Sequence, residues 1–167
     1  MSGGTTAAGW RAHSRDSSES AAIGEALGRL APDGALILLE GPLGAGKTTL
    51  AQGVGAGCGV AEPITSPTYN LILHYRGERP FTHVDLFRLE DESQLASLDL
   101  DEMLGGDGVT CVEWPALAER HVEPPWARVR ITPEDGPEAP RRIEIELAGE
   151  GWGGVRSALV GLEAGRA

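Results

Sequence analysis

The residues with the clearest chemical pattern lie in a short glycine-rich segment, residues 41–48, with the sequence Gly-Pro-Leu-Gly-Ala-Gly-Lys-Thr. Because glycine has no Cβ, successive backbone N–H groups there can turn toward one point and form a concave anion-binding nest. Lys47 would reach the β- and γ-phosphates of a nucleotide, and the Thr48 hydroxyl would bind Mg²⁺. We expect the phosphates to be bound by Leu43, Gly44, Ala45, Gly46, Lys47, Thr48 and Thr49.

The elements around this segment occur in the order that a phosphate-binding P-loop requires. The apolar run 35–39 predicts a buried strand before it, and Thr48 opens a segment that favours a helix. The helix N-terminus would add unpaired N–H donors and a partial positive charge. The alternative is a strand–helix turn that binds nothing, but the flanking elements favour the P-loop. Lys47 is also the only lysine in a chain with thirteen arginines, and it stands where a compact charge is needed.

Two acids follow predicted strands and are candidates to complete the site. Glu113 comes directly after the apolar run 109–112, and Asp85 follows residues 81–84. Ligands of open α/β sheets lie beyond the carboxyl ends of the parallel strands, so both carboxylates would face the P-loop and bind Mg²⁺. Each acid could instead be an exposed carboxylate without a ligand; spacing favours metal binding for Glu113 and does not decide for Asp85. Together with Lys47 they are the candidate catalytic residues.

A third candidate segment is Ser66-Pro67-Thr68. Proline fixes its own φ and biases Ser66 toward an extended conformation, so both hydroxyls would lie on a stiff loop. Ser66 and Thr68 could sense the γ-phosphate through Mg²⁺, as switch segments do, or merely cap the next strand. The pattern alone does not decide between these two roles.

The remaining pattern predicts a single α/β domain over residues 16–165, preceded by a disordered tail over residues 1–15. It is a three-layer P-loop NTPase fold, with helices on both sides of a mixed sheet that combines a parallel core and an antiparallel hairpin. The predicted hairpin pairs residues 69–75 with 81–85. Further strands are expected at 127–132 and 142–147, and helices at 16–31, from 48 to about 53 or 55, at 90–104 and at 155–162.

Composition narrows the function further. The chain has 167 residues and a net charge of −11, which argues against tight, unaided binding to nucleic acid. It has no apolar run long enough to cross a membrane and no signal-peptide pattern at its start. Cys58 and Cys111 lack metal-ligand spacing, so reduced thiols in a cytoplasmic protein are expected.

Four motifs together resemble the TsaE (YjeE) family of bacterial P-loop ATPases. They are residues 41–49, Ser66-Pro67-Thr68-Tyr69, His83-Val84-Asp85-Leu86-Phe87-Arg88-Leu89 and Val112-Glu113-Trp114-Pro115. The resemblance covers about residues 16–120 well and the last forty residues loosely. A P-loop alone would be unspecific, but four motifs in this order at these distances make the resemblance strong.

The resemblance implies a cytoplasmic ATPase that is required for the threonylcarbamoyl modification of adenosine beside the anticodon of tRNA. Such a protein binds ATP and Mg²⁺, associates with the TsaD–TsaB heterodimer and resets that complex by hydrolysis. It would meet tRNA only through these partners. By matching position, Thr48 and Glu113 become metal ligands, Asp85 the second strand-end acid, and Trp114 a neighbour of the nucleotide. Ser66 and Thr68 belong to a switch-like loop.

Three departures from the family pattern stand out. Pro42 occupies the position after the first P-loop glycine, where members usually carry an acid. Phe87 replaces a usual tyrosine and Tyr69 a usual phenylalanine, so both rings are kept. In the last forty residues, where the resemblance is loose, it implies that one of Arg141 and Arg142 corresponds to an arginine near the nucleotide.

Two other functions use the same loop. A small-molecule kinase would need an arginine-bearing lid, for which Arg76 and Arg79 are the only cluster, and we expect these in a hairpin turn. A non-catalytic ATP sensor would share every site residue and differ only in rate. No arginine finger is evident near the P-loop, so we expect slow hydrolysis by the isolated chain and acceleration by partners.

Overall fold

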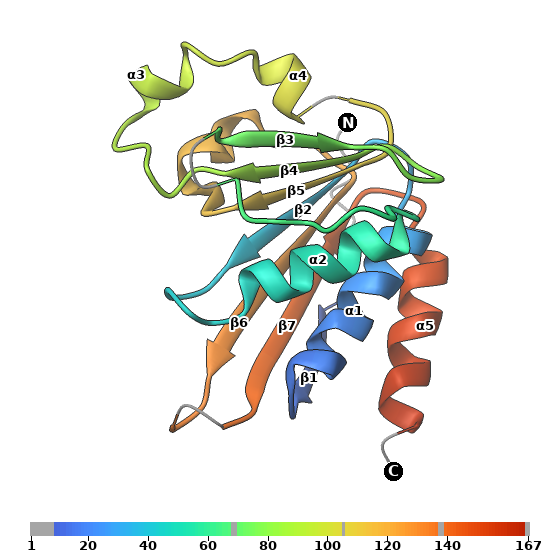
Figure 1. Ribbon diagram of the computed structural model, residues 1–167. Coiled ribbons are helices and arrows are strands. Elements are labelled where there is room, and N and C mark those ends of the chain that lie inside the picture. The colour runs from blue at the N-terminus through green and yellow to red at the C-terminus, as the bar shows by residue number, and fades with distance from the viewer. Residues whose placement is uncertain (1–8, 68–69, 105, 137–138, 166–167) are drawn as a thin grey trace, which may run out of the picture.

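The computed structural model describes residues 9–67, 70–104, 106–136 and 139–165. Their strands form one seven-stranded sheet in the order β1-β7-β6-β2-β5-β4-β3 (Figure 1). The strands are β1 (Gly9–Ser14), β2 (Ala35–Glu40), β3 (Ile72–Tyr75), β4 (Phe81–Asp85), β5 (Val109–Glu113), β6 (Trp126–Pro133) and β7 (Arg141–Ala148).

The sheet is mixed, as predicted. Strand β2 pairs in parallel with β5 and β6, and β5 pairs in parallel with β4. The outer strands are antiparallel: β3 pairs with β4 in the predicted hairpin, β7 with β6, and β1 with β7. The carboxyl ends of β2, β4 and β5 therefore meet at one edge of the sheet, where the site is built.

Helices cover both faces of the sheet and complete a three-layer α/β domain. On one face lie α1 (Ser17–Leu30), α2 (Lys47–Gly57) and α5 (Gly153–Ala164), as Figure 1 shows. The other face is covered by α3 (Glu92–Leu95), α4 (Leu100–Leu104) and the 3-10 helix η1 (Pro115–His121). Among the described helices, none combines the length and the apolar character that a membrane crossing requires.

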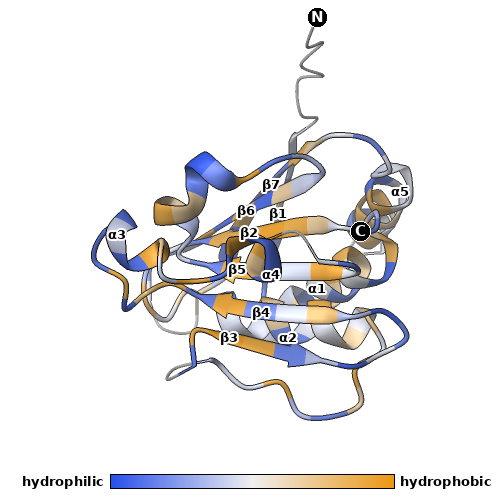
Figure 2. Ribbon diagram, turned by 90° about the horizontal axis from the view of Figure 1, so that it is seen from above, coloured by the Kyte–Doolittle hydropathy of each residue, from blue (hydrophilic) through white to orange (hydrophobic). Residues whose placement is uncertain are grey.

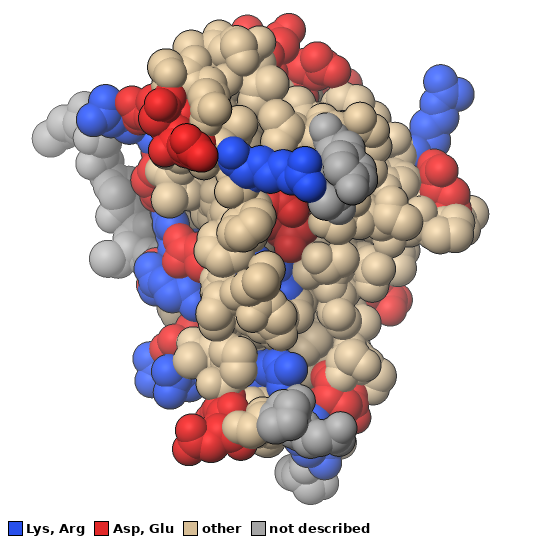
Figure 3. Space-filling view, turned by 60° about the vertical axis from the view of Figure 1, so that its left-hand side comes forward, with Lys and Arg blue, Asp and Glu red and all other residues tan. Residues whose placement is uncertain are grey.

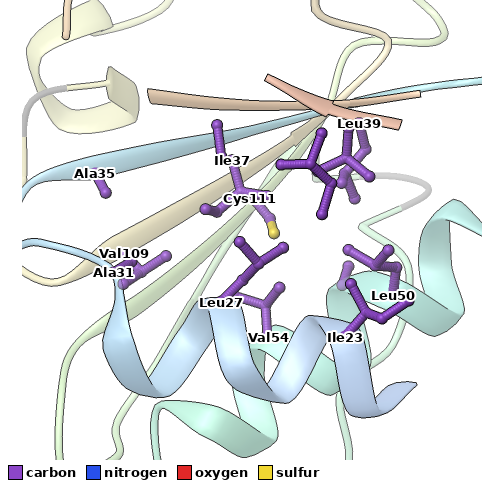
Figure 4. Close-up of a cluster of buried hydrophobic side chains, with 14 of the residues drawn as sticks. Ile23, Leu27, Ala31, Ala35, Ile37, Leu39, Leu50, Val54, Val109 and Cys111 are labelled. Atoms are coloured by element: carbon purple, nitrogen blue, oxygen red, sulfur yellow. The ribbon is translucent and has the colours of Figure 1, made fainter. Parts of the chain in front are cut away.

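Strand β2 is the centre of both hydrophobic cores. Ile37 and Leu39 pack with Leu27 of α1 and Leu50 of α2 on one face (Figure 4). On the other face, Leu36 and Leu38 belong to a second cluster beneath α3, α4 and η1. Burial on both faces is why β2 is a continuous apolar run instead of an alternating one, and it appears hydrophobic along most of its length in Figure 2.

The prediction of a disordered tail over residues 1–15 is wrong for its second half. Gly9–Ser14 form β1, which pairs antiparallel with β7 over the register Gly9↔Glu146 to Ser14↔Arg141. Trp10 packs against the main core. Pairing with β1 protects the edge of β7 from solvent. Residues 1–8 lie outside the described part of the chain.

Helix α2 is longer than predicted because its glycines serve packing. The expected end was Gly53 or Gly55, yet the helix continues to Gly57. A Cβ on Gly53 would lie 2.3 Å from the carbonyl oxygen of Ala21, and one on Gly57 would lie 2.2 Å from that of Glu25. The backbones of α1 and α2 are thus in direct contact, and this tertiary packing outweighs the low helix propensity of glycine.

The predicted helix at 90–104 is instead two short helices. Asp91 caps α3 through a capping box with Gln94, and α4 begins only at Leu100. Of the three residues with helical apolar spacing, Leu95 and Met103 are buried and Leu98 is partly buried. Strand β3 starts at Ile72, and Leu71 before it has a positive φ of 58°; position 69, the expected start, lies outside the described residues.

Candidate functional site

The glycine-rich loop between β2 and α2 forms an open cradle. Gly44 and Gly46 have φ values of 77° and 106°, and a Cβ at either position would meet no atom within 4 Å. A side chain there would thus enter free space in front of the loop. Helix α2 begins directly at Lys47 with Gly46 as its N-cap, so the first N–H groups of the helix have no intrahelical acceptor. This arrangement is a ready anion site.

Lys47 is folded back over its own loop. Its Nζ donates hydrogen bonds to the carbonyl oxygens of Gly41 (2.7 Å) and Pro42 (2.9 Å) and lies 4.0 Å from the ring centroid of Trp114. Only 4% of the residue is exposed. Burial lowers the pKa of the Lys47 ammonium, while Glu113 and Asp85 oppose that shift. The charge is thus held in the cradle by dipoles and an aromatic face.

Thr48 and Glu113 are brought together across the cleft as predicted. The Thr48 hydroxyl donates to Oε1 of Glu113 at 3.2 Å. The other carboxylate oxygen, Oε2, lies 2.8 Å from Nε2 of His83. Glu113 is 3% exposed and His83 fully buried. Glu113 is therefore a buried, doubly bonded carboxylate beside the start of α2.

The register of β4 and β5 explains this geometry. Asp85 is paired with Glu113, and His83 with Cys111, in the parallel ladder. Successive side chains of a strand alternate between faces, so His83, Asp85, Cys111 and Glu113 share the face that α2 covers. Both acids thus stand at the same edge, one strand apart.

Asp85 is more accessible than Glu113. Its Oδ1 accepts a hydrogen bond from the backbone N–H of Phe87 (2.9 Å), and its Oδ2 accepts one from the Ser66 hydroxyl (3.4 Å). Burial raises the pKa of the Asp85 carboxyl, the Phe87 N–H opposes this, and the charge of Glu113 adds to the rise. Ser66 therefore reaches the site, whereas Thr68 lies outside the described residues.

These groups line one cleft in the carboxyl edge of the sheet. Figure 3 looks onto this edge: mostly uncharged side chains surround the cleft, and an acidic group is visible at its centre below a basic side chain. The lining residues are Leu43, Gly44, Gly46, Lys47, Thr48, Thr49, Ser66, Asp85, Phe87, Arg88, Glu113 and Trp114. The hydroxyl of Thr48 and the two carboxylates are oxygen donors of the kind Mg²⁺ prefers, so the residues present fit a magnesium site.

Two residues of the cleft were not expected from the sequence. Arg88 lines it, although no arginine finger is evident from the sequence, because the chain that leaves the end of β4 at Asp85 stays at the same edge. The Phe87 ring is 56% exposed and lies 5.0 Å from the Trp114 ring. Trp114 itself has a positive φ of 56° at the turn from β5 into η1. The strained backbone places its ring against Lys47.

A second hollow lies on the other side of the start of α2. Gly46 and Thr49 line both this hollow and the cleft, whereas Ala45 lines the hollow but not the cleft. Its remaining lining residues are Ser14, Arg15, Asp16, Ser17, Ser20, Ala139 and Arg141. The sequence does not predict this hollow, because Ser14 and Arg15 belong to the predicted disordered tail.

The hollow also decides between the two neighbouring arginines. Nε of Arg141 donates to the carbonyl oxygen of Ala45 in the P-loop at 3.2 Å. Arg142 instead faces Glu144 at 3.8 Å. Because adjacent residues of β7 point to opposite faces, only Arg141 supports the loop.

Comparisons with known proteins agree with this geometry. Residues 14–143 match the family model "Threonylcarbamoyl adenosine biosynthesis protein TsaE". A relative from Nostoc named tRNA threonylcarbamoyladenosine biosynthesis protein TsaE is 42% identical over 128 residues, which is 74% of this chain and 76% of the relative. The protein of that name from Bacillus subtilis is 38% identical over 132 residues, or 78% and 81%.

A solved structure is similar over nearly the whole chain. The crystal structure of Bacillus subtilis YdiB superposes with a TM-score of 0.74 at 26% sequence identity and covers 96% of this chain and 98% of its own. Fold, P-loop and sequence matches lead to the same assignment: the chain belongs to the TsaE family.

Proposed function

We propose that this protein is a magnesium-dependent P-loop ATPase that serves the threonylcarbamoyl modification of adenosine in tRNA. One observation carries the chemical part: Thr48 and Glu113, from elements 65 residues apart, lie within 3.2 Å beside an open glycine cradle. A hydroxyl and a carboxylate at the phosphate end of a P-loop are the groups that hold nucleotide-bound magnesium. The names of the TsaE relatives support the biological part.

The cleft and the hollow would divide the nucleotide between them. The β- and γ-phosphates would lie over Gly44, Gly46 and the start of α2, with the magnesium on the side of Thr48 and Glu113. Thr49 and Gly46 line both spaces, so the α-phosphate would cross there. The adenosine would then lie in the hollow beside Ser14 and Arg141.

The chain's own residues would act mainly by positioning and charge. Lys47 would exchange the Gly41 and Pro42 carbonyls for phosphate oxygens. Glu113 and Thr48 would hold the magnesium, which neutralises charge on the transferred phosphoryl group. Asp85, whose raised pKa reflects its burial, would help to orient the attacking water with Glu113.

Partner binding fits the surface of the site. In the described part of the chain three large hydrophobic residues are exposed, and two of them, Leu43 (78%) and Phe87 (56%), stand at the mouth of the cleft. Exposed apolar groups at a polar cleft are typical of an interaction surface. We propose that homologues of TsaD and TsaB cover it in the cytoplasm. With a net charge of −11, the chain would leave tRNA binding to these partners.

The kinase alternative receives little support. Arg79 donates to the carbonyl oxygen of Gly28 at 3.0 Å and lies 3.8 Å from Asp33, so it ties the hairpin to the end of α1. A lid would need this arginine over the cleft. The ATP sensor alternative keeps the same residues and differs in turnover alone.

Phosphate release by the chain, with and without TsaD and TsaB homologues, tests the proposal. We expect slow release by the chain alone, faster release with the partners, and loss of tRNA modification with Lys47→Ala. Turnover as fast without partners as with them would contradict the accessory role. Modification that proceeds with ATP bound but not hydrolysed would favour the sensor.

A further inference from the structure

His83 is a buried polar residue directly behind the proposed metal site. It lies on β4, two residues before Asp85, and is fully buried. Its Nε2 lies 2.8 Å from Oε2 of Glu113. Its Nδ1 has no hydrogen-bond partner among the described residues. Burying an imidazole with one nitrogen unpaired is costly, so a purely apolar neighbour would serve packing better.

The contacts of Glu113 assign the proton of His83. Oε1 of Glu113 accepts from the Thr48 hydroxyl, so the carboxylate acts as an acceptor on that side. A proton on Nε2 of His83 gives Oε2 a donor as well. A proton on Nδ1 would leave a buried N–H unpaired and set a lone pair of Nε2 against the carboxylate. A proton on Nε2, donated to Oε2 of Glu113, therefore fits the surroundings.

This hydrogen bond orients the carboxylate. With Oε2 held by His83, Oε1 is left facing Thr48, and the Thr48 hydroxyl can donate to Oε1 while its oxygen binds a cation. Hydrogen bonds to a metal-binding carboxylate fix its orientation and commonly set metal affinity. Among the described residues, only Thr48 and His83 form side-chain hydrogen bonds with the Glu113 carboxylate.

We propose that His83 is a positioning residue that aims Glu113 at the metal ion. The inference rests on the proposed function, since it assumes that Thr48 and Glu113 bind a divalent cation together with a nucleotide. It predicts that His83 acts only through Glu113. A merely structural histidine would instead affect folding and every ligand alike.

The test is Mn²⁺ binding in the presence of ADP, measured by electron paramagnetic resonance on the full chain. His83→Asn and His83→Gln are matched, since both place an amide in the same apolar site, but only the glutamine reaches Glu113. We expect His83→Asn to weaken Mn²⁺ binding by about 10- to 100-fold and His83→Gln to stay within about threefold of wild type. ADP affinity in EDTA should change less than about twofold in both.

Two further variants test whether His83 acts through Glu113. In a Glu113→Gln background, His83→Asn should have no additional effect on Mn²⁺ binding, because the charged carboxylate that His83 aims at the metal is gone. Cys111→Ala, which disturbs the β5 residue paired with His83, should lower the unfolding temperature and leave Mn²⁺ affinity unchanged.

The outcomes separate the inference from the function beneath it. If wild type binds neither ADP nor Mn²⁺–ADP, the proposed function fails. If wild type binds both and His83→Asn binds Mn²⁺ as tightly as His83→Gln, the positioning role is wrong. An equal loss of ADP affinity in EDTA, or an undiminished effect of His83→Asn when Glu113 is glutamine, would also overturn it.

Discussion

The cleft and the hollow lie on opposite sides of the same helix start, yet their chemistry differs. The cleft gathers Lys47, Asp85 and Glu113 in a partly dehydrated space. Four of the ten residues that line the hollow carry hydroxyls, and the Ser14 and Ser20 side chains there are hydrogen-bonded to each other at 2.7 Å. The buried charges of the cleft would suit the phosphate end of a nucleotide, and the hydroxyls of the hollow would suit its sugar end.

The cleft and the hollow also differ in how well they stabilise the charges of their side chains. In the cleft, burial raises the pKa of Asp85 and lowers that of Lys47, so both charges are held where water would suit them better. In the hollow, Asp16 caps α1, and hydrogen bonds from Ser18 and Glu19 lower its pKa. The charges that burial disfavours are thus concentrated in the cleft, and such a concentration is typical of catalytic sites.

Glu113→Gln should have the largest effect, a loss of hydrolysis that comes from the metal site in the cleft alone. The amide keeps the size of the side chain and an acceptor for His83 but loses the charge that binds magnesium. We expect hydrolysis, measured with partners present, to fall by about 100- to 1,000-fold, with ADP affinity in EDTA unchanged. Glu62→Gln, an exposed acid on a loop, is the charge-matched control. A loss of metal-free ADP binding would show that the two sides are not independent.

Lys47→Ala should act on the phosphates themselves. Losing a charge-assisted hydrogen bond costs about 1.5–3 kcal/mol, so we expect ADP and ATP affinity to fall by roughly 10- to 100-fold with or without magnesium. Titration calorimetry measures this. Arg76→Ala removes one positive charge from the exposed hairpin turn and should leave affinity unaltered; equal losses in the two variants would indicate a general charge effect.

Arg141→Ala tests the hollow. The arginine supports the Ala45 carbonyl, and loss of one such hydrogen bond, about 1 kcal/mol, should weaken nucleotide binding by roughly fivefold. The dependence on magnesium concentration should not change, in contrast to Glu113→Gln. Arg142→Ala, the neighbouring arginine that faces Glu144, should bind like wild type. A shift in magnesium dependence with Arg141→Ala would contradict the assignment of metal binding to the cleft alone.

The smallest expected effect is on the free energy of unfolding. Asp85→Asn should stabilise the fold. Because burial raises the Asp85 pKa, the folded state holds its proton more tightly than the unfolded state, so wild type loses stability as pH rises past that pKa. The asparagine variant avoids this loss and should be more stable at pH 7 by a few tenths to about 1 kcal/mol, after screening by water.

Urea unfolding in EDTA measures the difference. The advantage of Asp85→Asn should shrink as the pH falls toward 3.5, because the wild-type carboxyl then takes up its proton in both states. An advantage that stays constant with pH would place its origin outside the carboxylate.

Much of the cleft follows from local sequence. A strand, a glycine loop and a helix start are neighbours in the chain, and Asp85 and Glu113 stand where apolar runs end, so the predicted strands β4 and β5 begin and end close to their expected positions. The bond between His83 and Glu113 was not predictable, because it depends on the register between two strands that are distant in sequence. The hollow was missed for a similar reason: Ser14 reaches it only because β1 pairs with β7.

The two errors in the helices have different origins, one local and one tertiary. Apolar spacing at Leu95 and Met103 is typical of one helix, but the capping box at Asp91 starts a short helix that ends before residue 99. The low helix propensity of glycine predicts an early end of α2, whereas the close approach of α1 explains why the helix continues to Gly57.

The backbone contact between α1 and α2 would mislead a mutational scan of this chain. A Cβ on Gly24 would stand 2.3 Å from the Leu50 carbonyl oxygen, and one on Gly28 would stand 1.9 Å from that of Val54. Such positions tolerate no replacement, which is the pattern usually attributed to ligand contact. Yet neither glycine is among the described residues that line the cleft or the hollow. Cellular protein abundance, scored alongside growth, would reveal that these losses come from the fold.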